Sequence, residues 1–127
     1  MNAPAMTPNA REGRLGKAKS FKEGAELMEL VMTDGADLRD GYVTMCVLAG
    51  IAAADVICMK ALGEYYAGQK HDEAVKLLEK VDKALAKNLA ALLGMKTKAG
   101  YSDVPVSNEQ ITRARRAMEA LVDRAAS

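Results

Sequence analysis

The stretch from Val43 to Met59 is almost wholly apolar, and Asp55 is its only charged residue. An apolar run of this length, rich in alanine, predicts a helix that is buried on most of its faces. The uncharged part before Asp55, residues 41–54, is shorter than the roughly 20 residues that cross a bilayer as a helix. We therefore expect a central core helix and no membrane association.

Asp55 places a carboxylate where burial is expensive. An unpaired buried charge is strongly destabilising, so we expect Asp55 to be paired, protonated, hydrogen-bonded or at the mouth of a cleft. One interpretation is a structural ion pair, or a hydrogen bond to a tyrosine hydroxyl, that fixes helix register without chemistry. The other is a role in a polar pocket whose remaining groups come from later parts of the chain.

The composition suits one helical domain. A chain of 127 residues can bury a core without disulfides or metal. Half of the residues are hydrophobic but only 4% are aromatic, so the core relies on aliphatic side chains and methionine, which suit close packing between helices. The formal net charge of +1 gives no global attraction for nucleic acid or anionic membranes, so any polyanion site must be a local patch.

Cysteine and histidine usage points to a reduced protein without a metal. Cys46 and Cys58 lie twelve residues apart in one predicted helix, about 18 Å along its axis, and cannot bridge each other there. We therefore expect a cytoplasmic protein. No cysteine or histidine spacing is typical of a metal site, and we predict no cofactor.

The first half of the chain predicts two long helices. Apolar residues recur at steps of three and four from Leu15, which indicates an amphipathic helix that ends at Asp34–Gly35. Asp37 is the expected N-cap of the next helix, which continues to about Leu62. Residues 63–70 interrupt the pattern and predict a connection.

The second half predicts two or three further helices. The apolar period returns over residues 71–93, and we favour a break near Val81–Lys83 over one continuous helix, because a shallow bundle cannot cover so long an apolar stripe. Residues 95–106 are expected to form a polar connection. Ser107 then caps the last helix, with Gln110 as the reciprocal half of a capping box.

These elements predict an all-α fold, a four- or five-helix antiparallel up-and-down bundle. We expect residues 1–13 to form a disordered N-terminal tail without the apolar core of a signal peptide. Residues 14–127 then form the single helical domain.

Four residues are candidates for a polar cluster at one end of the bundle: Asp55, His71, Lys96 and Tyr101. His71 is the only histidine and begins a helix, where it is either a cap or solvent-facing residue or part of a polar cleft. Lys96 and Tyr101 fall in the predicted 95–106 connection, which is basic and short enough to reach back over the bundle. The alternative for this connection is a solvated loop.

A second set, Lys98, Arg113 and Arg116, is a candidate phosphate-binding patch. Glu119 and Asp123 interleave with the arginines, so a solvated helix face explains the pattern as well. The basic start of the first helix adds a hint of RNA binding. No glycine-rich phosphate loop, serine elbow or paired-carboxylate motif supports nucleotide hydrolysis, and we predict no catalytic residues.

The order of segments resembles small bacterial HEPN-like proteins. After a basic amphipathic first helix come Ala49–Asp55, His71–Leu78 and Lys96–Ser102, and then a capped last helix. The resemblance covers roughly Leu15 to Ala125. It implies an up-and-down helical bundle that dimerises, in a setting of RNA cleavage, toxin–antitoxin pairs and phage defence.

The catalytic signature of the HEPN family, an arginine followed after four to six residues by histidine, is missing. Glu64, Tyr65 and Tyr66 occupy the positions before His71 where that arginine would stand. In the family mechanism the histidine acts on the 2′-hydroxyl or the leaving group and the arginine stabilises the phosphorane, so half of the electrostatic stabilisation is absent.

Three functions remain open. The first is a non-catalytic HEPN-like module, a homodimer that binds RNA or a protein partner in a regulatory role. The second is a divergent metal-independent ribonuclease toxin, in which His71 is the general acid or base and Lys70, Lys96 or Lys98 replaces the arginine. The third is a structural or assembly protein without a ligand.

Overall fold

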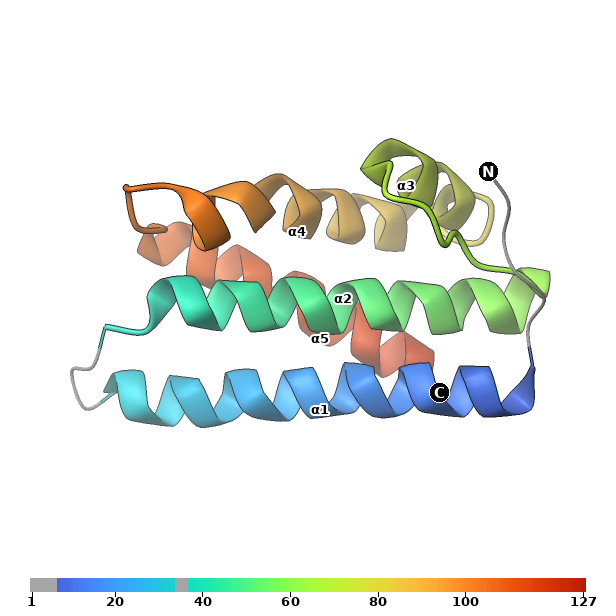
Figure 1. The fold of residues 1–127 in the computed structure, drawn as a ribbon, viewed down its shortest axis with the longest axis horizontal. Coiled ribbons are helices and arrows are strands. Elements are labelled where there is room, and N and C mark those ends of the chain that lie inside the picture. Colours follow the sequence, from blue (N-terminus) through green and yellow to red (C-terminus); the bar gives the residue numbers. More distant parts are fainter. Residues whose placement is uncertain (1–6, 34–36) are drawn as a thin grey trace.

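The computed structural model describes residues 7–33 and 37–127, and these residues form five helices with no strand among them (Figure 1). The helices are α1 (Pro8–Thr33), α2 (Arg39–Leu62), α3 (His71–Glu79), α4 (Lys83–Tyr101) and α5 (Asn108–Ala126). The predicted all-α helical bundle is therefore confirmed.

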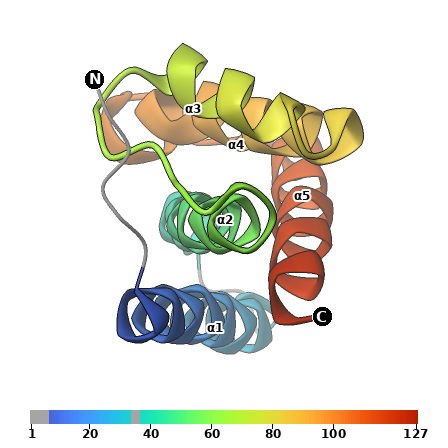
Figure 2. The same cartoon turned by 90° about the vertical axis from the view of Figure 1, so that its right-hand side faces the viewer.

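Helix α2 lies in the middle of the bundle. Figure 1 shows α1, α2 and α4 side by side, with the chain reversing direction from each of these helices to the next. Figure 2 shows α5 crossing the same side of α2 and α4, while the short α3 lies on α4. Because neighbours surround it, α2 contributes much of the core, as its apolar sequence predicts.

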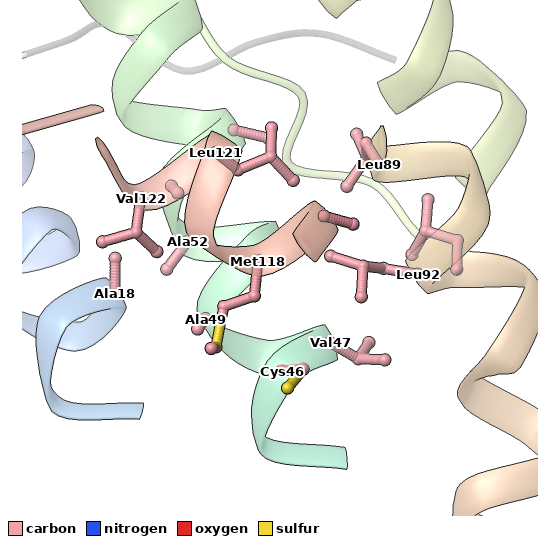
Figure 3. Close-up of a cluster of buried hydrophobic side chains, with 14 of the residues drawn as sticks. Ala18, Cys46, Val47, Ala49, Ala52, Leu89, Leu92, Met118, Leu121 and Val122 are labelled. Carbon is pink, nitrogen blue, oxygen red and sulfur yellow. The ribbon is translucent and has the colours of Figure 1, made fainter. Parts of the chain in front are cut away.

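Part of the core lies between α2, α4 and α5. Figure 3 shows this cluster, with Met118, Leu121 and Val122 of α5 above the small side chains of α2. Gly50 of α2 permits the approach, because a Cβ atom there would overlap the side chain of Leu92 and lie 3.3 Å from Cδ1 of Leu121.

Local signals end and start the helices as predicted at three points. Gly63 ends α2 in the left-handed conformation (φ 73°), and its N–H donates to the carbonyl of Met59. Asp82 interrupts the long apolar stripe by capping α4 through the backbone N–H of Leu85, which confirms the break between two helices. Ser107 and Gln110 form the predicted capping box of α5.

The start of the first helix differs from the prediction. Helix α1 begins at Pro8, so residues 8–13, expected in the tail, are helical. Proline is favoured in the first turn of a helix, and the Oγ1 atom of Thr7 accepts from the N–H of Ala10. Residues 1–6 and the predicted helix end at Asp34–Gly35 lie outside the described residues.

The predicted N-cap of α2 was also wrong. Leu38 holds the capping position without a side-chain hydrogen bond. Asp37 instead accepts from Nε of Arg39 at 3.1 Å, because a charged partner two residues away competes for its carboxylate.

The predicted polar connection over residues 95–106 was wrong in its first half. Helix α4 continues to Tyr101, so Lys96, Lys98 and Tyr101 lie on a helix. Met95 and Ala99 are buried and extend the apolar face of α4, and this packing outweighs the cost of glycine in the last two turns. Only residues 102–107 connect α4 to α5.

Helix α2 is long and apolar enough to cross a membrane, but 72% of its most apolar 18-residue window is buried inside the bundle. This burial fits the core helix of a soluble protein.

Candidate functional site

A half-open cavity of about 550 Å³ lies between α2, α3, α4 and the connection that joins α2 to α3. No described residue of α1 or α5 lines it, and Figure 2 shows that connection on the side of α2 away from α5. The volume is within the range of small-molecule sites in proteins. Half of its lining residues form an apolar part of the wall: Ile51, Ala54, Cys58, Ala74, Leu77, Leu89 and Leu93.

The acid, the two lysines and the histidine that line the cavity come from three separate segments. Asp55 stands on α2, Lys96 on α4, and Lys70 and His71 at the start of α3. Three of the four residues predicted as a polar cluster, Asp55, His71 and Lys96, therefore line one cavity. Tyr101 does not lie among its lining residues within the described chain; its side chain is 83% exposed at the end of α4.

The counter-charge of Asp55 is Arg14 of α1. The Nη1 atom of Arg14 donates to Oδ2 of Asp55 at 3.0 Å, and the carboxylate side chain is only 15% exposed. The Nη2 atom of Arg14 donates to the hydroxyl of Tyr65 at 2.8 Å, and the guanidinium lies 4.1 Å from the centre of the tyrosine ring. The ion pair expected for Asp55 is present, with its partner earlier in the chain.

Burial dominates the acidity of Asp55. Removal from water raises the pKa of the carboxyl to about 7, and the positive charge of Arg14 opposes that rise without cancelling it. Near neutral pH this carboxyl changes its protonation state at the cavity wall.

Arg14 and Tyr65 were not predicted as site residues. Arg14 precedes Ala18 by four residues and Ala25 by eleven, and both alanines are fully buried, so the arginine falls in the helical register of the buried face of α1. This register was the sequence signal that could have indicated a partly buried Arg14. Tyr65 is buried in a connection without periodicity, and no local pattern indicates its contact.

The cavity rim depends on Tyr66 and Gly68. The backbone N–H of Lys70 donates to the Tyr66 hydroxyl at 3.3 Å, which folds the connection back on itself. The Tyr66 ring lies so close to Gly68 that a Cβ atom there would overlap it. Both residues line the cavity, so this close approach shapes its rim.

The candidate phosphate patch is only partly assembled. Arg113 and Arg116 are exposed on α5 and line one shallow depression together with Glu109. Lys98 is half-buried on α4 and does not line this depression among the described residues. An acidic side chain in the same depression as the two arginines reduces the attraction for a phosphate.

Both cysteines are free and buried. Burial raises the pKa of Cys58, which lines the cavity, and that of Cys46 in the core to about 12, so both thiols stay protonated near neutral pH. Among the described residues, no group of three or more histidine, cysteine, aspartate or glutamate side chains is placed to hold a metal ion.

Comparison with protein-family models, curated proteins and solved structures finds no match to this chain.

Proposed function

We propose that this protein is a non-catalytic helical binding module with a regulatory role, and that the cavity lined by Asp55, His71 and Lys96 is its binding site. The cavity carries the proposal: it combines an apolar patch of wall with polar groups brought together from α2, α3 and α4, and such a combination is typical of a ligand site. The resemblance to HEPN-like proteins supports a toxin–antitoxin or phage-defence setting, and the two reduced thiols support a cytoplasmic location.

The bonding of Arg14 supports binding over RNA cleavage. In the HEPN mechanism a guanidinium must be available to a phosphorane beside the histidine. Arg14 is bonded to Asp55 and Tyr65 and does not line the cavity among the described residues. These two hydrogen bonds would have to break before the guanidinium could turn towards a phosphorane beside His71.

A ribonuclease remains the second candidate, because Lys70 and Lys96 line the same cavity as His71. In this alternative His71 is the general acid or base and a lysine stabilises the phosphate charge. The discriminating assay is RNA degradation in excess chelator. We expect the wild-type protein to degrade RNA no faster than a His71→Ala variant does. Metal-independent degradation by the wild-type protein that the variant lacks would establish the enzyme instead.

For a macromolecular partner, the surface favours protein over RNA. Several basic side chains are engaged in ion pairs with acids, including Lys22 with Glu26 and Arg124 with Asp82. Meanwhile Leu27, Leu30 and Val31 of α1 are 50–68% exposed on consecutive turns. Adjacent exposed aliphatic side chains are typical of protein-binding surfaces.

The partner proposed for this α1 face is a second copy of the chain. The first half of α1 carries most of its basic side chains, including Lys17 and Lys19. The second half carries Glu23, together with Glu26 and Glu29, which already have partners within the chain. Two antiparallel copies of α1 would place the basic half of each against the acidic half of the other. This complementarity supports a homodimer.

Ligand occupancy of the cavity is the direct test of the binding role. Methyl NMR signals from Ile51, Leu89 and Leu93 report on binding at the cavity wall. A screen of small amphipathic molecules should shift these signals and leave the methyl signal of Met118, in the buried face of α5, unchanged. A structural protein without a ligand would show no selective shift, and that result would refute the proposal.

A further inference from the structure

The lining of the cavity narrows the chemistry of its ligand. We propose that it takes a small amphipathic organic anion, an apolar body with one carboxylate. This inference rests on the proposed function, which makes the cavity the binding site, and adds the charge and shape of the occupant.

One part of the cavity wall is apolar. Ala54, Cys58 and Leu89 line it with side chains no more than 4% exposed, and Leu77 and Leu93 complete the wall from α3 and α4. Cys58 adds a neutral thiol, since burial raises its pKa to about 12. An aliphatic or aromatic body of a ligand would therefore displace water from apolar surface on several sides.

The rim is positively charged. Lys70 and Lys96 line the cavity from opposite segments, one at the start of α3 and the other on α4. The acidic residues of the first turn of α3, Asp72 and Glu73, do not line the cavity itself; they line a neighbouring depression that shares Lys70 and His71 with it. The two lysines are therefore placed to pair with an anion at the mouth of the cavity.

The start of α3 adds to this preference. Lys70 is the N-cap residue and makes no side-chain capping hydrogen bond, so the first N–H groups of the helix lack that partner. The positive end of the helix dipole lies at the rim, where Lys70 and His71 line the cavity.

Asp55 does not reverse the sign of the rim. It is the only acidic lining residue in the described chain, and its carboxylate is matched by the guanidinium of Arg14 at 3.0 Å. Once that pair is counted as neutral, the two lysines set the charge that a ligand meets. A cationic amphiphile would be repelled by the charges of both lysines.

The experiment compares three probes with one octyl chain: octanoate, octanol and octyltrimethylammonium. Titration calorimetry gives the affinities, and the methyl signals of Ile51, Leu89 and Leu93 locate the ligand. We expect octanoate to bind roughly tenfold more tightly than octanol and the cation to bind most weakly. Naphthoate in place of octanoate distinguishes an aromatic body from an acyl chain.

Two sets of variants assign the interaction. Replacing Lys70 and Lys96 together by glutamine should weaken octanoate about tenfold and leave octanol unchanged. The matched control replaces Lys76 and Lys80 by glutamine. These lysines do not line this cavity among the described residues, so the control should change neither the affinity for octanoate nor that for octanol. Ala74→Leu narrows the cavity and should weaken both ligands.

The outcomes separate the two levels of the proposal. Equal affinity for octanoate and octanol, or no effect of the lysine changes on octanoate, would overturn the anion preference while leaving the cavity as a binding site. Failure of all three octyl probes and naphthoate to shift the cavity methyl signals would overturn the binding site itself.

Discussion

Arg14 and Asp55 stand 41 positions apart in the chain and meet at 3.0 Å, Nη1 to Oδ2, where the first part of α1 lies against the last third of α2. Tyr65 accepts the second hydrogen bond of the same guanidinium. One arginine thus joins the first helix, the central helix and the connection that borders the cavity. The positive charge of Arg14 also opposes the rise in the pKa of the Asp55 carboxyl that burial causes.

The raised pKa of Asp55 predicts a stability that falls as pH rises. Between about pH 4, where the unfolded chain ionises, and about pH 7, the folded state keeps a proton that the unfolded state has lost. The free energy of unfolding should decline over this interval by on the order of 2 kcal/mol relative to Asp55→Asn. Urea denaturation at a series of pH values checks the slope, and parallel curves for the two proteins would contradict the prediction.

Arg14→Met should be destabilising in a pH-dependent way. Without its counter-charge the Asp55 carboxylate is left partly buried and unpaired, which costs about 1–3 kcal/mol when ionised. At pH 5 the carboxyl is protonated and the loss should be smaller than at pH 8. Lys17→Met, an exposed change on the same helix, is the matched control and should show no such difference; an equal loss at both pH values in Arg14→Met would argue against the ion pair.

Glycine replacements should have opposite signs at two helical positions. Gly50→Ala forces a methyl group into the contact with Leu92 and Leu121, and we expect a loss of about 1–3 kcal/mol in the free energy of unfolding. Gly94→Ala meets nothing within 4 Å and should stabilise α4 by up to about 1 kcal/mol. Thermal or urea unfolding measures both, and a stabilising Gly50→Ala would mean that the helices are not this close.

The proposed homodimer predicts that Leu30→Glu yields a monomer. Leu30 is 68% exposed, so the change should leave the fold intact while it charges the α1 face. Val104→Glu, at 59% exposure on the α4–α5 connection, is the control and should remain dimeric. Light scattering coupled to size exclusion measures the mass. Antiparallel charge pairing also predicts that high salt weakens the dimer; a wild-type monomer at all concentrations would exclude it.

Much of this fold was readable from local signals. The apolar periods located the helices, and the predicted capping box at Ser107 satisfies backbone groups within a few residues of itself. The break near Val81–Lys83 was predicted from the length of the apolar stripe, and the structure adds that Asp82 caps α4 there. Local sequence signals did not predict where α4 ends. Met95 and Ala99 continue the helix by packing against the core, and that stabilisation outweighs the glycines that indicated a loop.

The candidate site was likewise predictable only in its local features. A charge inside the most apolar run indicated that Asp55 needs a partner, and the sequence by itself established this need together with the helical frame. Only the tertiary structure decided that the partner is Arg14, that His71 and Lys96 share the cavity with Asp55, and that Tyr101 lies outside it in the described chain. The physical reason is range: caps and periodicity act within one or two turns, whereas ion pairs and cavities join side chains from helices whose relative positions depend on the whole core.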